Sequence, residues 1–175
     1  MSKSTLTDLK KRRSIRSYKP DQITDEELDA ILEAGTWAPT GMGCQGVVIV
    51  AVQNKAAIGK IQKLNADVLD DPKAKPFYGA PTVVNVFIDK NKPTPVENGN
   101  LVIGNLLNAA QAVGVGSCYI YRAKEVFCSE DGKALMKKWK VPADFEAVGH
   151  VLLGYADGPA PKAADRKKGY VIKIK

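Results

Sequence analysis

The longest uninterrupted apolar run of this chain, Val47–Val52, is only six residues long. A run of that length is too short to cross a lipid bilayer, which takes about 20 apolar residues. It has the length and the β-branched content of a strand buried in a sheet. The composition is 45% hydrophobic and 26% charged, as in ordinary soluble globular proteins, so the sequence predicts a single domain over residues 1–175.

Helical and strand patterns interleave along the chain around about five strands. The expected strands are residues 47–52, 82–89, 117–121, 146–155 and 170–174, and the expected helices are centred on residues 6–9, 24–35, 58–68, 101–113 and 135–139. Thr24 and Glu27 form a capping-box pattern at one helix start, and Gly35 is suited to the end of that helix. Two helices precede the first strand, which lacks a glycine-rich phosphate turn, so the order is not a simple βαβ series.

The helix expected at residues 101–113 is apolar on nearly all sides. Such a helix is buried on most of its surface, either in a core or in a subunit interface. The interface interpretation predicts a homodimer.

Three cysteines and one histidine limit the chemistry that the side chains can perform. The odd cysteine count and the lack of a Cys-x-x-Cys pair argue against a disulfide framework and against a zinc or iron–sulfur site. A histidine-based triad would depend on His150 alone, which lies in an apolar strand and is interpreted as a core or interface histidine. Residues 1–11 lack the apolar core of a signal peptide, so a cytoplasmic location is expected.

The net charge of +7 is spread over scattered lysines, but the arginines are clustered. Three of the five, Arg12, Arg13 and Arg16, fall within five residues. Guanidinium groups offer a planar fork of donors that suits phosphate, so the cluster indicates a small anionic ligand. Positive charge at the end of the first helix, favoured by the helix dipole, is an equally weighted alternative. Aromatic residues do not interleave with basic clusters, as a nucleic-acid stacking surface would require.

Two further segments are candidates for ligand contact. Residues 38–46 form a loop of small residues that allows a ligand to approach the backbone, although a plain connecting loop is an alternative. A basic loop, Lys162–Lys168, could form a second arm around the same anion or a solvated tail. The Gly-x-Gly of residues 114–116 follows a helix and precedes a strand, the reverse of the dinucleotide-binding order, so that interpretation is rejected.

In their order and spacing, these segments resemble the FMN-dependent nitroreductase family. Arg12–Tyr18 is similar to the family's Arg-x-Ser-x-Arg/Lys-x-aromatic signature, and residues 38–45 to its Ala-Pro-Ser-x-x-Asn-x-Gln loop. Residues 114–120 resemble its Gly-Leu-Gly-Ser-Cys-Trp-Ile segment. Residues 148–155 and Arg166–Lys168 resemble its C-terminal blocks, so the match runs nearly from end to end.

The resemblance implies an α+β fold in which helices flank a mixed sheet, and a homodimer with two FMN molecules at its interface. It implies an oxidoreductase that takes electrons from NAD(P)H and passes them to a nitroaromatic, a quinone or a related small acceptor by a ping-pong mechanism. Two alternatives stay open. One is other flavin chemistry on the same fold, namely reductive dehalogenation or flavin fragmentation, and the other is a cofactor-free, basic nucleic-acid-binding domain.

The resemblance also implies which residues contact FMN, without a catalytic side chain or a metal. The phosphate contacts would be Arg12, Arg13, Ser14 and Arg166, with Arg16 at the pyrimidine edge. Pro39, Thr40 and Gly41 would come from the partner subunit, Tyr119, Ile120 and Tyr121 would lie near flavin N5, and Gln45, Asn65 and Lys168 complete the set. Gly43 replaces the family's usual Asn, and Gly46-Val47 its Pro-aromatic pair, which leaves the substrate open.

Overall fold

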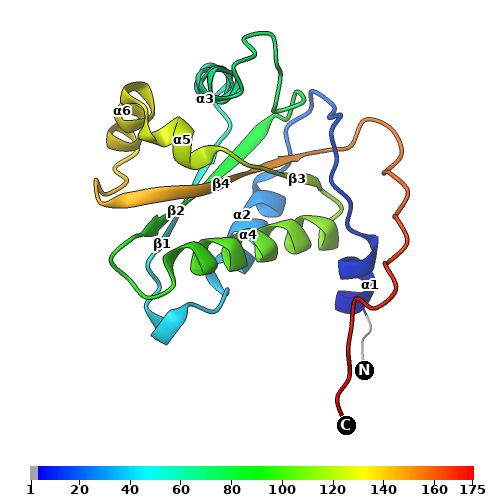
Figure 1. Cartoon of the computed structure of the whole chain (residues 1–175). Coiled ribbons are helices and arrows are strands. Elements are labelled where there is room, and N and C mark those ends of the chain that lie inside the picture. Colours follow the sequence, from blue (N-terminus) through cyan, green and yellow to red (C-terminus); the bar gives the residue numbers. More distant parts are fainter. Residues whose placement is uncertain (1–3) are drawn as a thin grey trace.

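A four-stranded antiparallel sheet with the strand order β1-β2-β4-β3 forms the centre of the molecule (Figure 1). Its strands are β1 (Val47–Val52), β2 (Thr82–Asp89), β3 (Gly116–Ile120) and β4 (Phe145–Gly154). The computed structural model describes residues 4–175. None of the helices within that range has both the length and the apolar character needed to span a membrane.

Helices cover both faces of this sheet (Figure 1). On one face lie α2 (Asp25–Thr36) and α4 (Pro95–Ala112), and on the other lie α3 (Lys55–Val68), α5 (Ala123–Cys128) and α6 (Glu130–Lys138). The short helix α1 (Ser4–Lys11) contacts α4. Two apolar clusters, one on each face, therefore make up the core, and the predicted α+β class is confirmed.

The capping box predicted at Thr24 and Glu27 is present at the start of α2. The other end of this helix differs from the prediction, because the helix continues through Gly35 to Thr36. A Cβ atom at Gly35 would lie 2.7 Å from Cδ2 of Leu106 in α4. The glycine therefore serves the close packing of two helices and not the termination of one.

The strand predicted at residues 170–174 does not pair with any other strand in residues 4–175. Its side chains, Tyr170, Val171, Ile172 and Ile174 among them, are exposed. The sheet consequently has four strands, all paired antiparallel, where about five in a mixed sheet were expected. Strand β1 was expected to be buried, but it forms an edge of the sheet, so most of its residues are only half-buried. The short helix α5 was not predicted.

Helix α4 explains the apolar pattern of residues 101–113. Val102, Ile103 and Leu106 are buried against α2 and the sheet, whereas Leu101 is 47% exposed. One chain thus covers most of the apolar surface of this helix, and the helix alone does not require a partner subunit.

The single histidine lies at the centre of the sheet, opposite Asn85 in the pairing of β2 with β4. The Asn85 amide donates to the carbonyl of Val50, so its oxygen is free to accept the Nδ1 proton of His150 at 2.7 Å. The Nε2 atom of His150 is buried and has no hydrogen-bond partner in the described chain, and the imidazole ring packs against the rings of Phe77 and Phe127. Burial lowers the pKa of His150 from 6.5 to about 3, helped by the positive charge of Arg122. His150 is thus a neutral core residue, in agreement with the sequence-based interpretation.

We expect His150 to stay neutral, with its proton on Nδ1, when the pH falls from 7.5 to 5. The unfolded chain takes up a proton near pH 6.5 whereas the folded protein does not, so stability is full above that pH and decreases below it. This histidine alone should lower the free energy of unfolding by about 2 kcal/mol at pH 5. A ¹H–¹⁵N correlation spectrum of the untagged protein reports the tautomer, and an imidazole that titrates near pH 6.5 in the folded protein would contradict the prediction.

Candidate functional site

The arginine segment, residues 12–16, is attached to strand β3 through its backbone. The amide of Ile15 donates to the carbonyl of Ser117 at 2.9 Å, and Ser14 forms a parallel bridge with Ser117. Ile15 is buried, and a Cβ atom at Gly116 would lie 3.1 Å from its Cγ1 atom. The absence of a side chain at Gly116 therefore lets this segment approach the strand closely.

Cys118, which follows Ser117 in β3, lies beside the charged side chains of the arginine segment. Burial raises the pKa of the Cys118 thiol, while the positive charges of Arg16 and Arg12 and a hydrogen bond with Ser14 lower it part of the way. The thiol stays protonated at neutral pH because burial is the largest of these effects. Arg12, Ser14 and Arg16 thus form a cationic corner next to a neutral, buried thiol.

The three clustered arginines do not have the same role. Arg13 donates from Nη1 to the carbonyls of Lys10 and Arg12, both at 2.7 Å, and so provides hydrogen-bond donors for carbonyl groups at the end of α1. Of the two interpretations of the arginine cluster, positive charge at the C-terminal end of a helix therefore applies to Arg13. Within residues 4–175, no hydrogen bond or ion pair holds the guanidinium of Arg12 or Arg16, and Arg16 is exposed, so both retain donors for a ligand.

The chain after β4 returns to the arginine segment over its first few residues. The amide of Asp157 donates to the carbonyl of Ser17 at 3.0 Å, and a cavity of about 150 Å³ lies between Arg13, Ser117 and Ala160. Further along, Arg166 donates to the carbonyl of Ala164 in its own loop, and Lys168 is exposed. The predicted contribution of Arg166 and Lys168 to the same site is not formed within the single chain.

The residues at the end of β3 point in different directions. Ile120 is buried in the same core cluster as Cys118, so only its backbone is accessible to a ligand. Tyr119 lies across Gly149, where a Cβ atom would come within 2.2 Å of its ring, and its hydroxyl donates to the carbonyl of Val148 at 3.4 Å. Tyr121 is 63% exposed. The two tyrosines are therefore the accessible side chains of this predicted group.

Asn65 joins α3 to the segment that follows β3. Its fully buried amide donates to the carbonyl of Tyr121 at 3.2 Å, and its oxygen accepts from Nε of Arg122 at 3.1 Å. Arg122 has a φ of +77°, in the left-handed region that non-glycine residues rarely adopt. Asn65 therefore holds a strained backbone and a guanidinium in place. Arg122 was not predicted as a site residue, although it directly follows the predicted Tyr119–Tyr121 group.

The loop of residues 38–46 is held by Asn98 from the first turn of α4. The Asn98 oxygen accepts from the amide of Gly41 at 2.8 Å, and its amide donates to the carbonyl of Pro93 at 2.7 Å and to Sγ of Cys44 at 3.6 Å. Within the loop, the hydroxyl of Thr40 accepts from the amide of Gln45 at 3.0 Å. Sequence reasoning missed Asn98, because the predicted helix began three residues after it and no sequence signal pairs it with Gly41.

The loop and the arginine segment lie at opposite ends of α4. Asn98 in the first turn holds the loop, whereas Gln111 in the last turn lines the cavity beside Arg13. Gln111 lies 13 positions after Asn98, which corresponds to about 20 Å along a helix axis. The two groups are also attached to opposite edge strands, β1 and β3. The single chain therefore does not bring Pro39, Thr40, Gly41 and Gln45 to the arginines.

A statistical description of the nitroreductase family matches residues 9–155. The chain belongs to the nitroreductase family. The resemblance inferred from its motifs is thereby confirmed. A solved nitroreductase with bound FMN from Bacteroides fragilis superimposes with a TM-score of 0.89 at 28% identity, and the match covers 98% of each chain.

Curated relatives within this family carry different activities in their names. An iodotyrosine deiodinase of Thermotoga neapolitana is 26% identical over 172 residues, which cover 87% of this chain and 89% of the relative. An FMN reductase [NAD(P)H] of Bacillus subtilis is 42% identical over 60 residues, which cover 34% of this chain and 23% of that protein. Family membership therefore establishes a flavoprotein oxidoreductase of the nitroreductase type, whereas the substrate differs from one relative to another.

We expect Asn65→Leu to lower the free energy of unfolding by about 1–3 kcal/mol, because it leaves the Tyr121 carbonyl and the Arg122 guanidinium without their buried partner. Urea unfolding followed by circular dichroism measures the loss. Asn100→Leu, at an exposed position of α4, serves as the control and should change the free energy by less than about 0.5 kcal/mol. Equal stability of the two variants would show that the Asn65 contacts contribute nothing.

Proposed function

We propose that this protein is an FMN-dependent oxidoreductase that takes electrons from NAD(P)H and passes them to a nitroaromatic, a quinone or a related small acceptor. The observation that carries the proposal is the cationic corner beside β3, where the guanidinium groups of Arg12 and Arg16 have no hydrogen-bond or ion-pair partner within residues 4–175. FMN-bound nitroreductases are among the structures that the chain resembles over nearly its whole length. A cofactor-free nucleic-acid-binding domain has no comparable support.

The residues of the cationic corner fit the chemistry of FMN. Arg12 and Ser14 would hold the phosphate, since a guanidinium and a hydroxyl donate to its oxygens, and Arg13 would add a donor that the end of α1 does not use. Arg16 would face the pyrimidine edge of the flavin, where its positive charge favours the reduced cofactor and raises the reduction potential. Bound FMN supplies the hydride chemistry, and the chain binds, orients and tunes it. The buried, protonated thiol of Cys118 is not needed as a nucleophile.

The other end of the flavin would be completed by a second copy of the chain. Pro39, Thr40, Gly41 and Gln45 lie about 20 Å along α4 from the arginines of their own chain, so they are suited to a site on a partner. Asn65 and Arg122 would supply a fixed cation beside Tyr119 and Tyr121, and Arg166 and Lys168 would join the phosphate if their loop rearranges. The active unit would be a homodimer with two sites.

The acceptor can be tested directly, because one relative points to different chemistry on the same fold. The Thermotoga neapolitana relative makes reductive dehalogenation the second candidate function. The purified protein should be yellow, with flavin absorbance bands and about one FMN per chain. Oxidation of NADH and NADPH is then measured with a quinone, a nitroaromatic and 3-iodotyrosine as acceptors. Turnover of the first two supports our proposal, deiodination alone supports the alternative, and a colourless protein that fails to bind added FMN overturns both.

Removal of the cationic corner should release the cofactor. We expect Arg12→Ala to weaken FMN binding by about 1.5–3 kcal/mol, the loss of a hydrogen bond to a charged group, and Arg12→Ala/Arg16→Ala to weaken it further. FMN content after dialysis and fluorescence titration with FMN measure the effect. Lys10→Ala/Lys19→Ala removes two positive charges from exposed flanking positions and should retain FMN. Full FMN retention by the double arginine variant would refute the assignment.

The dimer should be visible in solution and should depend on the exposed C-terminal segment. Trp37 is 78% exposed and Met42 93% exposed, and residues 170–174 expose further apolar side chains, as expected for surface that an obligate interface of more than about 2,000 Å² would cover. Light scattering should give a mass of about twice 18.9 kDa, and removal of residues 170–175 should shift it toward the monomer. A monodisperse FMN-bound monomer of the full chain at micromolar concentration would contradict the prediction.

A further inference from the structure

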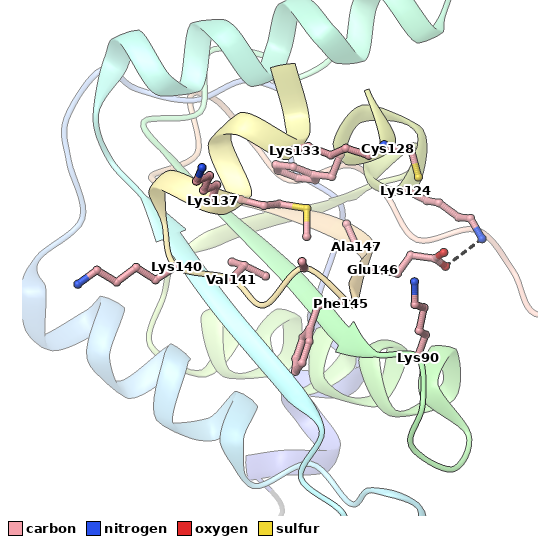
Figure 2. A pocket seen from close by; sticks show the side chains of 13 residues that line it. Lys90, Lys124, Cys128, Lys133, Lys137, Lys140, Val141, Phe145, Glu146 and Ala147 are labelled. Carbon is pink, nitrogen blue, oxygen red and sulfur yellow. Dashed lines mark ion pairs between the residues drawn. The ribbon is translucent and has the colours of Figure 1, made fainter. Parts of the chain in front are cut away.

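A cavity lies away from the cationic corner, between α5, α6 and the start of β4 (Figure 2). Its volume is about 570 Å³, within the range of roughly 300–1,000 Å³ that small-molecule sites occupy. It shares no lining residue with the arginine segment or with β3. We call it the lysine-rimmed pocket.

The floor of this pocket is apolar and belongs to the core. Phe127, Met136, Val141 and Ala147 line it, and each is almost fully buried. Phe127 is fixed by edge-on contacts with the rings of Phe87 and Trp139. The floor is therefore a rigid apolar surface that favours a hydrocarbon or an aromatic body over water.

The rim of this pocket is strongly positive. Five lysines line it, from the turn after β2, from α5, from α6 and from the turn after α6: Lys90, Lys124, Lys133, Lys137 and Lys140. Glu146 is the one acidic lining residue, and it forms an ion pair with Lys124 at 2.9 Å (Figure 2). No carboxylate within residues 4–175 forms an ion pair with the other four lysines.

The helix dipole does not account for this arrangement. It favours cations in the last turn of α6, where Lys137 lies, but Lys133 lies near the start of that helix and Lys90 lies in the turn after β2. Four lysines without an ion pair in residues 4–175, from α6 and from the turns after β2 and after α6, line one apolar floor, and such a concentration of positive charge attracts an anion.

We infer that the lysine-rimmed pocket binds an amphipathic anion, with its apolar body against Phe127 and Met136 and its carboxylate or phosphate head at the lysines. A head of either kind accepts hydrogen bonds from ammonium groups. A neutral molecule of the same length lacks the ionic contacts, and a cation of the same length is repelled. This binding site is separate from the proposed flavin site and does not depend on it.

The methionines provide an internal control for a binding experiment. The chain has three, of which Met136 lines the pocket floor, whereas Met42 lies exposed in the loop of residues 38–46. The protein as purified, with any FMN that it retains, is labelled with ¹³C-methyl methionine and titrated with octanoate, octyl phosphate, 1-octanol and octylammonium. The Met136 methyl signal should shift and saturate with one or both anions below about 5 mM, while the Met42 signal stays in place.

Charge-removing variants test the role of the rim. We expect Lys133→Gln/Lys137→Gln to weaken binding of the anion by about fivefold, the effect of two partly screened charge contacts. Lys73→Gln/Lys75→Gln removes two exposed lysines outside the pocket and should change the dissociation constant by less than about twofold. Saturation by octanoate alone or by octyl phosphate alone identifies the preferred head. The inference is overturned if Met136 responds to neither anion, if it responds equally to 1-octanol or octylammonium, or if both double variants bind alike.

Discussion

The pairing of β2 with β4 is the constraint on which the rest of this structure depends. Asn85 and His150 face each other in the middle of that pair, and the helices pack on its two faces. The remaining strands can add only at its outer sides, β1 next to β2 and β3 next to β4. The loop that precedes β1 is thereby kept away from the arginine segment attached to β3.

The two parts of the candidate site, the arginine segment and the loop of residues 38–46, are separated for this reason. The arginine segment gains its position from backbone hydrogen bonds to β3, and the loop of residues 38–46 gains its position from Asn98 at the far end of α4. Each group is held by hydrogen bonds within one chain, yet the two do not form a closed site with each other. A single rigid helix thus divides the proposed flavin contacts into two halves of the same subunit.

Local patterns predicted the elements well, whereas the roles of individual polar residues depended on distant contacts. The capping box at Thr24 and the strand at residues 82–89 follow from neighbouring residues, and both were confirmed. The function of Gly35 depends on Leu106, 71 positions later. Arg13 resembled its neighbours in sequence, but the carbonyls at the end of α1 distinguish it from Arg12 and Arg16. The prediction of a strand at residues 170–174 was wrong, because this alternating segment has no partner strand in the part of the chain that the structure describes.

The length of α4 has a genetic consequence if the proposed homodimer forms. Each site would then combine the arginines of one subunit with the loop of the other. A chain damaged only at Arg12 and a chain damaged only at Asn98 would each be inactive alone. Mixed dimers of the two would contain one doubly damaged site and one intact site, so the two alleles would complement each other and restore up to half of the activity per mixed dimer.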